Sequence, residues 1–445
     1  MTTTLTTDEL RTLQSRLAAA DAALQQRYPG DSERRQPVHT VYGGAQLFRA
    51  DTAVKLGAIA RRAFADYAPD PELFASVLGV TPGLAGTVHE RVGRKLEVEP
   101  VEDFRIDFED GYGNRPDAEE DGHAVAAAAE VARGMAESLL PPYIGIRIKQ
   151  PSPELRGRAM RTLDLFVTAL LERAGALPDN FVVTLPKVTV PEQAAYFADV
   201  LAALEAKLGL AERTLVFEFM VETPQLIIGA DGRCALPLVL EASAGRAVAA
   251  HFGTYDYTAA CGVTAAEQRM RHPACDHARH AMQVAFAGTG LWLSDGSTAV
   301  LPVPPHRGDD VNDTQRAENA VVMQRAWKLH YDDVQDSLMR GFYQGWDLHP
   351  AQLVTRYAAL YDFFLRGLDP AAERLHNFVE KAAQATLLGE MFDDAATGQG
   401  LLNYFLRAIN AGAVGAEETL ARTGLTLDEL QGRSFVRIMR GRRGG

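Results

Sequence analysis

Short runs of apolar and β-branched residues recur eight times along the chain, and apolar positions at helical spacing follow most of them. The clearest run is Thr214–Pro224, where Glu218 and Glu222 are the charged positions and Pro224 prevents further ladder pairing. It predicts a buried strand that ends on the carboxylate of Glu222. The other seven runs are Pro37–Gly44, Asp103–Asp110, Tyr143–Lys149, Asn180–Val188, Ala247–Tyr257, Gly290–Gly296 and Gly341–Pro350.

Helical periodicity fills most of the intervals between these runs. The main predicted helices are Asp51–Tyr67, Ala118–Leu139, Glu154–Ala174, Pro191–Gly209 and Val311–Met339. Strands that alternate with helices pair in parallel through right-handed crossovers, and eight such strands close a barrel. We therefore expect an α/β chain with a (β/α)8 TIM barrel over residues 37–368, and a doubly wound open sheet is the alternative.

Two helical segments flank the predicted barrel. The run Asp8–Gln26 has leucines at helical spacing after Thr7, a candidate N-cap, and predicts a helix within residues 1–36. Residues 369–445 predict helices without strands. These helices are Leu375–Leu388, Leu401–Ala411 and Ala416–Thr423, each followed by a glycine. We expect a helical C-terminal extension that packs on its own barrel or reaches a neighbouring subunit.

The overall charge excludes some classes of partner. A net charge of −13 disfavours nucleic acid and anionic membranes as the main ligand, because both require basic surface. No run reaches the roughly 18 to 20 apolar residues that span a bilayer, and the N-terminus lacks the pattern of a signal peptide. Cys234, Cys261 and Cys275 show no metal-site spacing and indicate buried thiols in a reducing compartment. We expect a cytoplasmic protein that acts on a small molecule.

Acidic residues lie at the ends of several predicted strands. Glu222 and Asp256 end two strands that we expect to be parallel neighbours, so both would face one cavity, which suits a hard divalent cation. For either residue, a helix cap or an ion pair is the alternative. Glu109 and Asp110 also end a strand, and adjacent residues of a strand point to opposite faces. One of them would face the cavity while the other caps the next helix.

Basic residues also lie near the predicted strand ends. Arg147 lies between two isoleucines in a strand, and its guanidinium could bind a carboxylate or polarise a keto oxygen. Lys187 could form a Schiff base, but that chemistry needs a desolvated amine, and an acid-rich cavity favours an ion pair instead. His272, His277 and His280 are unevenly spaced, which favours the start of a helix over a zinc site.

Six short motifs, in chain order, resemble those of the citrate lyase β-subunit and HpcH/HpaI aldolase family. They are IDFED at 106–110, IRI at 146–148, TLPKV at 184–188, VET at 221–223, FGTYD at 252–256 and GFYQGWDLHPAQ at 341–352. The resemblance implies a magnesium-dependent (β/α)8 barrel that makes or breaks a carbon–carbon bond next to a carbonyl. The loop after IDFED and the long C-terminal extension depart from the family pattern, which leaves the substrate open.

The resemblance also implies roles for individual residues. Glu222 and Asp256 would ligate Mg²⁺, or Mn²⁺ in its place, and Arg147 would contact the substrate carboxylate or oxo group. Glu109 and Asp110 would be catalytic residues with Arg147, since they would shape the site and hold metal-bound water. Backbone amides of the following turn would bind further substrate oxygens, at Gly253, Thr254 and Tyr255.

The resemblance further implies the class of substrate and the assembly. The substrate would be a carboxylated hydroxyacyl-coenzyme A or a hydroxy-oxo acid, and the protein would be a homo-oligomer, either a trimer or a hexamer. Two other functions compete with this one. They are a Schiff-base aldolase that uses Lys187 and a non-catalytic barrel that only binds a ligand.

Overall fold

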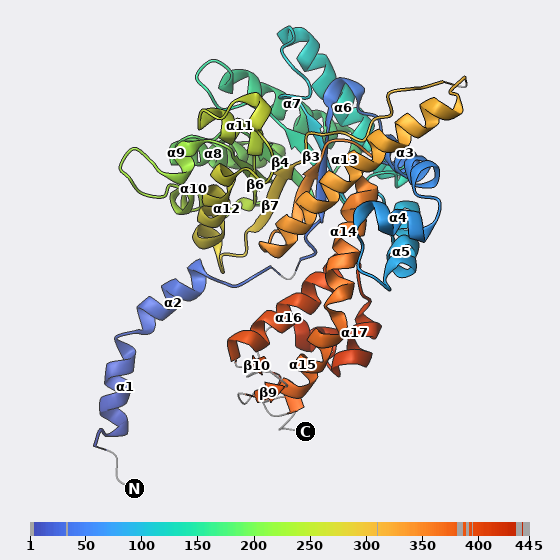
Figure 1. The fold of residues 1–445 in the computed structure, drawn as a ribbon. Helices are drawn as coiled ribbons and strands as arrows, with labels where there is room; N and C mark the ends of the chain where they lie inside the picture. Colours follow the sequence, from blue (N-terminus) through green and yellow to red (C-terminus); the bar gives the residue numbers. More distant parts are fainter. Residues whose placement is uncertain are drawn as a thin grey trace.

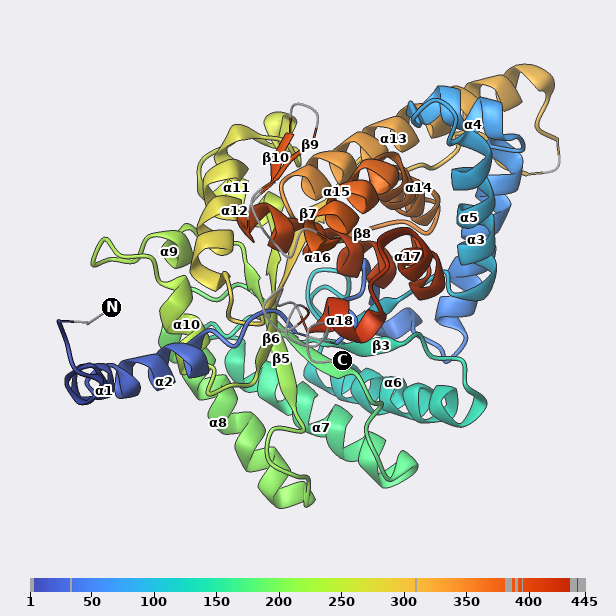
Figure 2. The same cartoon turned by 90° about the horizontal axis from the view of Figure 1, so that it is seen from below.

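A closed parallel barrel forms the centre of the molecule (Figures 1 and 2). The computed structural model describes residues 4–432 and 438, apart from 33, 309, 381–385, 389–390 and 394. The barrel strands are β1 (His39–Gly44), β2 (Asp103–Asp107), β3 (Tyr143–Arg147), β4 (Phe181–Leu185), β5 (Val216–Val221), β6 (Ala247–Phe252), β7 (Trp292–Ser297) and β8 (Gln344–Asp347). Pairing of His39 in β1 with Gly345 in β8 closes the barrel. The predicted barrel is confirmed, and the open-sheet alternative is wrong.

Helices surround the barrel (Figure 2). They are α3 (Thr52–Tyr67), α4 (Pro71–Leu78), α5 (Ala85–Val98), α6 (Asp117–Glu137), α7 (Arg156–Ala174), α8 (Pro191–Leu208), α9 (Pro224–Ile227), α10 (Leu236–Ala242), α11 (Thr254–Ala260), α12 (Pro273–Phe286), α13 (Asp313–Met339) and α14 (Gln352–Arg366). Helices α4 and α5 lie between α3 and β2, an interval for which no helix was predicted above. Asp70 caps α4, Pro71 starts it and Gly79 ends it in a left-handed conformation. These end signals were present in the sequence and were missed.

The inside of the barrel holds charged side chains, whereas barrels of this kind are usually filled by branched apolar residues. Arg105 of β2 donates from Nε to Glu218 Oε1 at 2.9 Å and from Nη2 to Glu218 Oε2 at 2.8 Å. It also pairs with Asp103. Phe104 and Ile106 alternate with these residues and join the apolar core instead. The polar half of the strand pattern therefore faces the barrel axis.

The C-terminal extension packs under the N-terminal ends of the barrel strands (Figure 1). It consists of α15 (Leu368–Glu380), β9 (Thr386–Leu388), β10 (Met391–Asp393), α16 (Ala395–Asn410), α17 (Ala416–Thr423) and α18 (Leu427–Gln431). Asn410 Nδ2 donates to the carbonyl of Gln36, just before β1, at 2.6 Å, and Asn410 Oδ1 accepts from the Gln36 N–H at 3.0 Å. Of the two predicted alternatives, the described residues therefore show packing on the chain's own barrel.

The prediction of an extension without strands is wrong, because β9 and β10 form an antiparallel pair. The predicted helix Leu375–Leu388 ends at Glu380, and its residues 381–385 lie outside the described part of the chain. At the other end, the predicted N-terminal helix is two helices, α1 (Thr7–Ser15) and α2 (Ala18–Arg27), and neither has a buried residue. The division at residues 36/37 and 368/369 stays a prediction.

Three further predictions concern the cysteines, His272 and membrane-spanning helices. Cys275 is buried as expected, whereas Cys234 and Cys261 are exposed, because Cys234 lies in the connection before α10 and Cys261 at the end of α11. His272 is the N-cap of α12 and accepts from the Ala274 N–H, which agrees with a helix start. Within the described ranges, every helix is too short or too polar to cross a bilayer.

Candidate active site

Four carboxylates gather around Lys187 where the barrel strands end. The Lys187 ammonium lies 2.5 Å from Glu109 Oε1, 3.0 Å from Asp110 Oδ1 and 3.8 Å from Asp256 Oδ1. The Lys187 backbone N–H donates to Glu222 Oε1 at 2.7 Å. These acids follow β2, β5 and β6, while Lys187 follows β4. The structure thus brings all four predicted acids together, and the predicted ion pair of Lys187 is present.

The backbone of Lys187 is strained. Its φ angle is +51°, in the left-handed region that residues with a side chain rarely adopt. Such conformations cost of order 1–3 kcal/mol and persist where the surrounding structure enforces them, often at functional sites. At Lys187, the N–H is held by Glu222 after the neighbouring strand β5, and the ammonium is held by Glu109 and Asp110 after β2. The strained backbone is a further reason to place function here.

Glu222 lies deepest of the four acids and is almost fully buried. Burial, together with the negative charges of Asp256 and Glu109, raises the pKa of Glu222 to about 8. The residue opposite must be small, because a Cβ on Gly253 would lie 2.4 Å from Glu222 Oε2. Glu222 therefore occupies a space that the missing side chain of Gly253 leaves open. The negative charge of Asp256 contributes to the raised pKa of Glu222.

The pKa values of Glu109 and Asp110 shift in opposite directions. Burial and the charge of Asp110 raise the pKa of Glu109 to about 7, against the effect of Arg147 and Lys187. Burial also acts to raise the pKa of Asp110, but a hydrogen bond with Glu109 and the charges of Arg147 and Lys187 outweigh it and lower that pKa. The prediction that these two acids face opposite ways is wrong. Strand β2 ends at Asp107, and the chain then turns so that both acids reach Lys187.

Arg147 lies beneath the acids with one edge of its guanidinium turned toward them. Its Nε and Nη2 donate to Asp107 Oδ1 and Oδ2 at 2.7 and 2.5 Å. Its guanidinium carbon lies 4.7 Å from the ring centroid of Tyr42 and 5.4 Å from that of Trp346. The remaining nitrogen, Nη1, lies 3.3 Å from Glu109 Oε2. A substrate oxygen would therefore reach Arg147 at Nη1.

Asp107 is the functional residue that the sequence reasoning missed. It accepts from Nε and Nη2 along one edge of the Arg147 guanidinium and also accepts from the N–H groups of Glu109 at 2.9 Å and Gly111 at 2.7 Å. One carboxylate therefore fixes both the arginine and the loop that carries Glu109 and Asp110. A signal existed, because Asp103, Arg105 and Asp107 alternate with apolar residues and so share one face of β2.

The turn after β6 offers fewer donors than expected. The Gly253 N–H already donates to the Val221 carbonyl at 3.0 Å, and the substrate contact at Gly253 stays a prediction. The Tyr255 hydroxyl donates to the Ser297 carbonyl at 2.9 Å. The amides of Thr254 and Tyr255 lie in the first turn of α11, where N–H groups have no acceptor within the helix. These two amides keep their predicted role.

The donor set fits a hard divalent cation. Among the described residues, no three His, Cys, Asp or Glu side chains form a ready-made metal cluster. Mg²⁺ is commonly bound through one or two carboxylates and retains several waters. Glu222 and Asp256 provide two such carboxylates, and two of the four acids around Lys187 have raised pKa values. When all four acids are ionised, they carry more negative charge than Lys187 neutralises, which favours an additional cation.

We expect the affinity for Mg²⁺ to rise from about pH 6 to about pH 8. The pKa values of about 8 for Glu222 and about 7 for Glu109 mean that both carboxyls are largely protonated near the lower pH. A cation binds the ionised forms and displaces these protons. Each displaced proton weakens binding by up to about tenfold per pH unit below its pKa. Calorimetry in buffers of different ionisation enthalpy measures both effects, and pH-independent affinity without proton release would contradict this prediction.

Replacing Lys187 by methionine is expected to strengthen Mg²⁺ binding by about tenfold or more. The ammonium repels a cation bound among the same acids, and two charges 4 Å apart interact by about 1 kcal/mol even in bulk water. Without metal, the variant should also melt at a lower temperature, because the acids lose their counter-charge. Lys55→Met, at an exposed i,i+4 pair with Asp51, is the matched control and should change neither quantity. Weaker Mg²⁺ binding in the Lys187 variant would contradict this prediction, because it would show that the lysine favours binding of the cation.

Comparisons with known proteins agree with the fold. A family model described as Domain of unknown function (DUF6986) matches residues 17–438. No curated protein matches the sequence. A citrate lyase from Burkholderia xenovorans LB400 is similar in structure with a TM-score of 0.55 and 18% identity, over 88% of this chain and 97% of that chain. At this identity the likeness supports the barrel fold alone.

Two further solved structures are more distant. Malate synthase from Haloferax volcanii has a TM-score of 0.47 and 16% identity, over 91% of this chain and 98% of that chain. The protein CitE from Mycobacterium tuberculosis has a TM-score of 0.38 and 16% identity, over 73% of this chain and 90% of that chain.

Proposed function

The chain belongs to this family, Domain of unknown function (DUF6986), and we propose that it is a divalent-cation-dependent carbon–carbon lyase. Its substrate would be a small carboxylated molecule, either a hydroxyacyl-coenzyme A or a hydroxy-oxo acid. The observation that carries the proposal is the convergence of four carboxylates and Arg147 at the C-terminal mouth of a barrel. The six sequence motifs, which resemble those of the citrate lyase β-subunit family, support the same class of reaction.

Glu222 and Asp256 would hold Mg²⁺ or Mn²⁺, which supplies Lewis-acid stabilisation of the negative charge on an enolate. Arg147 stays charged, because burial alone would lower its pKa but the carboxylate of Asp107 raises it well above the usual range. Its Nη1 would bind a substrate carboxylate or oxo group, and Asp107 keeps it in place. The amides of Thr254 and Tyr255 would bind a second oxygen.

Glu109 would exchange a proton with the substrate. Its pKa of about 7 lies in the range where a carboxyl both accepts and donates a proton near neutral pH. An acid or a histidine of the C-terminal extension is an alternative base. The described part of the extension lies at the opposite end of the barrel strands, so within one chain it does not reach this site. Glu109 would take the hydroxyl proton as the carbon–carbon bond breaks.

Calorimetric titration with Mg²⁺, alone and with pyruvate, oxaloacetate or acetyl-coenzyme A, tests the function. We expect Mg²⁺ to bind and to raise the affinity for an oxo acid or a thioester, and turnover of the matching substrate to stop in the presence of a chelator. Binding of Mg²⁺ without any effect on these ligands would favour a non-catalytic barrel. Turnover that survives chelation and is trapped by borohydride would favour the Schiff-base aldolase.

The proposal includes a cytoplasmic homo-oligomer, either a trimer or a hexamer. The exposed N-terminal helices support an assembly, since α1 and α2 have no buried residue and their leucines are open to solvent. These leucines are Leu10, Leu13 and Leu24. Light scattering after size-exclusion chromatography measures the assembly, and a monomer at micromolar concentration would contradict it.

A further inference from the structure

The N-terminal helices α1 and α2 form an arm, residues 7–27, that projects away from the barrel (Figure 1). Every residue from 4 to 29 is exposed. Pro29 follows the arm, and the next residue, Gly30, donates its N–H to the Gly288 carbonyl, between α12 and β7, at 2.8 Å. The arm therefore leaves the body at a fixed point and buries none of its own residues.

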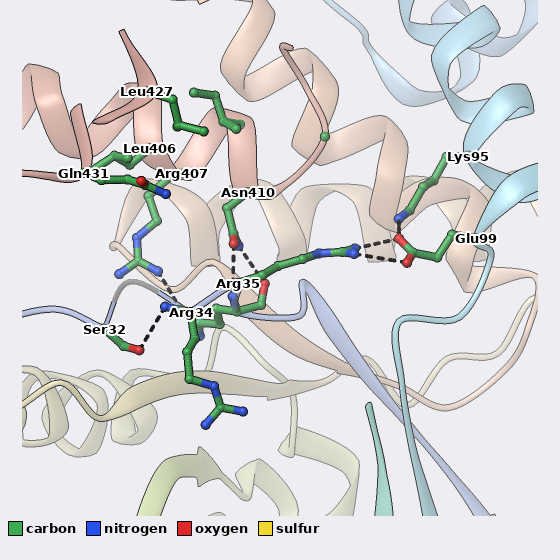
Figure 3. A pocket seen from close by; sticks show the side chains of 13 residues that line it. Ser32, Arg34, Arg35, Lys95, Glu99, Leu406, Arg407, Asn410, Leu427 and Gln431 are labelled. Atoms are coloured by element: carbon green, nitrogen blue, oxygen red, sulfur yellow. Dashed lines mark hydrogen bonds and ion pairs between the residues drawn. The ribbon is translucent and has the colours of Figure 1, made fainter. Parts of the chain in front are cut away.

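The segment that follows the arm is held on two sides (Figure 3). Arg35 Nη1 donates to Glu99 Oε1, at the end of α5, at 3.0 Å. The Gln36 backbone forms two hydrogen bonds with the Asn410 side chain of α16. The arm is thus joined to the body through an anchored segment, so whatever binds the arm is also held close to the barrel.

Residues 7–27 are suited to form one continuous helix. The two residues between α1 and α2 are Arg16, with φ −68° and ψ −23°, and Leu17, with φ −89° and ψ −16°. Both lie close to the right-handed helical region. The range contains neither glycine nor proline, the two residues that most often break a helix. A small change at this junction therefore gives a single rod about 31 Å long.

Apolar side chains recur along this rod at alternating spacings of three and four residues. In a heptad they occupy successive a and d positions, which form the seam of a coiled coil. The four leucines of the seam are 42%, 46%, 59% and 60% exposed in chain order. Such a seam is stabilised by packing against a second helix, because a short isolated helix is marginal in water. The seam residues are Leu10, Leu13, Leu17, Ala20 and Leu24.

The charges beside the seam fit a second copy of the same arm. With Leu10, Leu17 and Leu24 at a positions, Arg16 occupies a g position and Asp21 the next e position. In a parallel coiled coil, the g side chain of one helix lies beside the next e side chain of the other. Arg16 of each copy would then lie beside Asp21 of the other. Two pairs of opposite charges favour this alignment.

We propose that the arm pairs with the arm of a second copy as a parallel two-stranded coiled coil. Ala20 favours two strands, because a layer of three alanines would leave a void on the axis of a three-stranded coil, and voids are destabilising. Pairing two by two requires an even number of copies. Of the two assemblies proposed above, it therefore selects the hexamer. The inference rests on that proposed assembly and does not depend on the lyase chemistry.

Light scattering of the full-length protein after size-exclusion chromatography tests the pairing. We expect a hexamer for the parent. The variant with both Leu13→Glu and Leu17→Glu should have half that mass, because charged side chains at adjoining d and a positions are costly to bury. Both leucines are exposed within one chain, so the melting temperature of the barrel should change little. Leu238→Glu, at an exposed position of α10, is the matched control and should keep the parent mass.

Exchanging the charges tests the alignment of the two arms. Arg16→Asp should raise the concentration at which the assembly separates into halves by about tenfold, because two attractive pairs become repulsive. Adding Asp21→Arg restores opposite charges and should return the parent value. Gln26→Asp places a negative charge on the outer face of the arm and should change little. Sedimentation velocity over a dilution series measures these concentrations.

Engineered cysteines test the parallel register. In the proposed pair the two copies of position 10 face each other, and a disulfide requires Cα atoms within about 7 Å. Leu10→Cys should therefore link two chains under mild oxidation, whereas Ser15→Cys, on the outer face, should not. Electrophoresis without reductant measures the linked fraction. The parent gives the background from its two exposed cysteines, Cys234 and Cys261.

The outcomes separate this inference from the other proposals. A monomeric parent would overturn both the assembly and the pairing, whereas a trimeric parent would overturn the pairing alone. So would a parent hexamer whose mass the double glutamate variant keeps, or a fall to one third of that mass. Equal linking of the two cysteine variants, or failure of Asp21→Arg to reverse Arg16→Asp, would contradict the parallel alignment. Binding of Mg²⁺ affects none of these readings.

Discussion

Replacing Glu222 by glutamine is expected to weaken Mg²⁺ binding about 100-fold or more and to abolish metal-dependent turnover. Glu222 would be one of two carboxylates that bind the cation, and loss even of groups that only orient metal ligands costs about 10- to 100-fold. The side chain keeps its shape, and its amide oxygen can still accept from the Lys187 N–H. The effect should therefore come from the lost charge.

The same substitution should stabilise the metal-free protein at high pH. The folded-state pKa of Glu222 is raised to about 8, so ionising this carboxyl costs folding stability as pH rises from its unfolded pKa to about 8. Glutamine does not ionise, and the difference from the parent should grow over that interval and then level off. Urea unfolding at several pH values in the presence of a chelator measures it. Glu241→Gln, at an exposed position of α10, is the control, and equal Mg²⁺ affinity in both variants would reject the ligand role.

Replacing Arg147 by leucine is expected to lower the free energy of unfolding by about 3–5 kcal/mol. Arg147 and Asp107 are both buried and form a two-point ion pair. Removing one partner leaves an uncompensated buried charge, which is the costly part of breaking such a pair. Turnover should also fall to background, because the Nη1 contact to the substrate is lost.

A double variant separates the lost charge from lost packing. In Arg147→Leu with Asp107→Asn, the buried negative charge is removed while an acceptor remains for the Glu109 N–H, so much of the stability should return. Arg133→Gln disrupts an exposed pair with Glu130 and should cost less than about 1 kcal/mol. Urea unfolding of the four proteins measures these differences. A loss as small for Arg147→Leu as for Arg133→Gln would mean that the buried pair contributes little.

The barrel was predictable because its signals are local and repeated. Each strand-like run and its following helix show the expected periodicity, and the closure of eight strands follows from their number. The hairpin of β9 and β10 was not predictable in this way. Its strands have three residues each, which is too short for a period of two to stand out within an apolar stretch.

The acids of the site were also predictable, since each lies at the end of a strand and parallel strands end at one face of the barrel. Their geometry was not. The turn that brings both Glu109 and Asp110 to Lys187, and the left-handed backbone of Lys187, depend on contacts between strands that are distant in sequence. Asp107 was not predicted as a site residue, because the prediction of its strand used the apolar positions and not the polar positions that alternate with them.

The most direct measurement of the central claim is the anomalous diffraction signal of a crystal soaked with Mn²⁺ and oxaloacetate. We expect one strong peak about 2.0–2.6 Å from carboxylate oxygens of both Glu222 and Asp256, the range for hard cations with oxygen ligands. We also expect the Lys187 ammonium to move away from the acids and an oxygen of the oxo acid to lie at Arg147 Nη1. A fully occupied Mn²⁺ elsewhere, with Lys187 still among the four carboxylates, would contradict a cation site at Glu222 and Asp256.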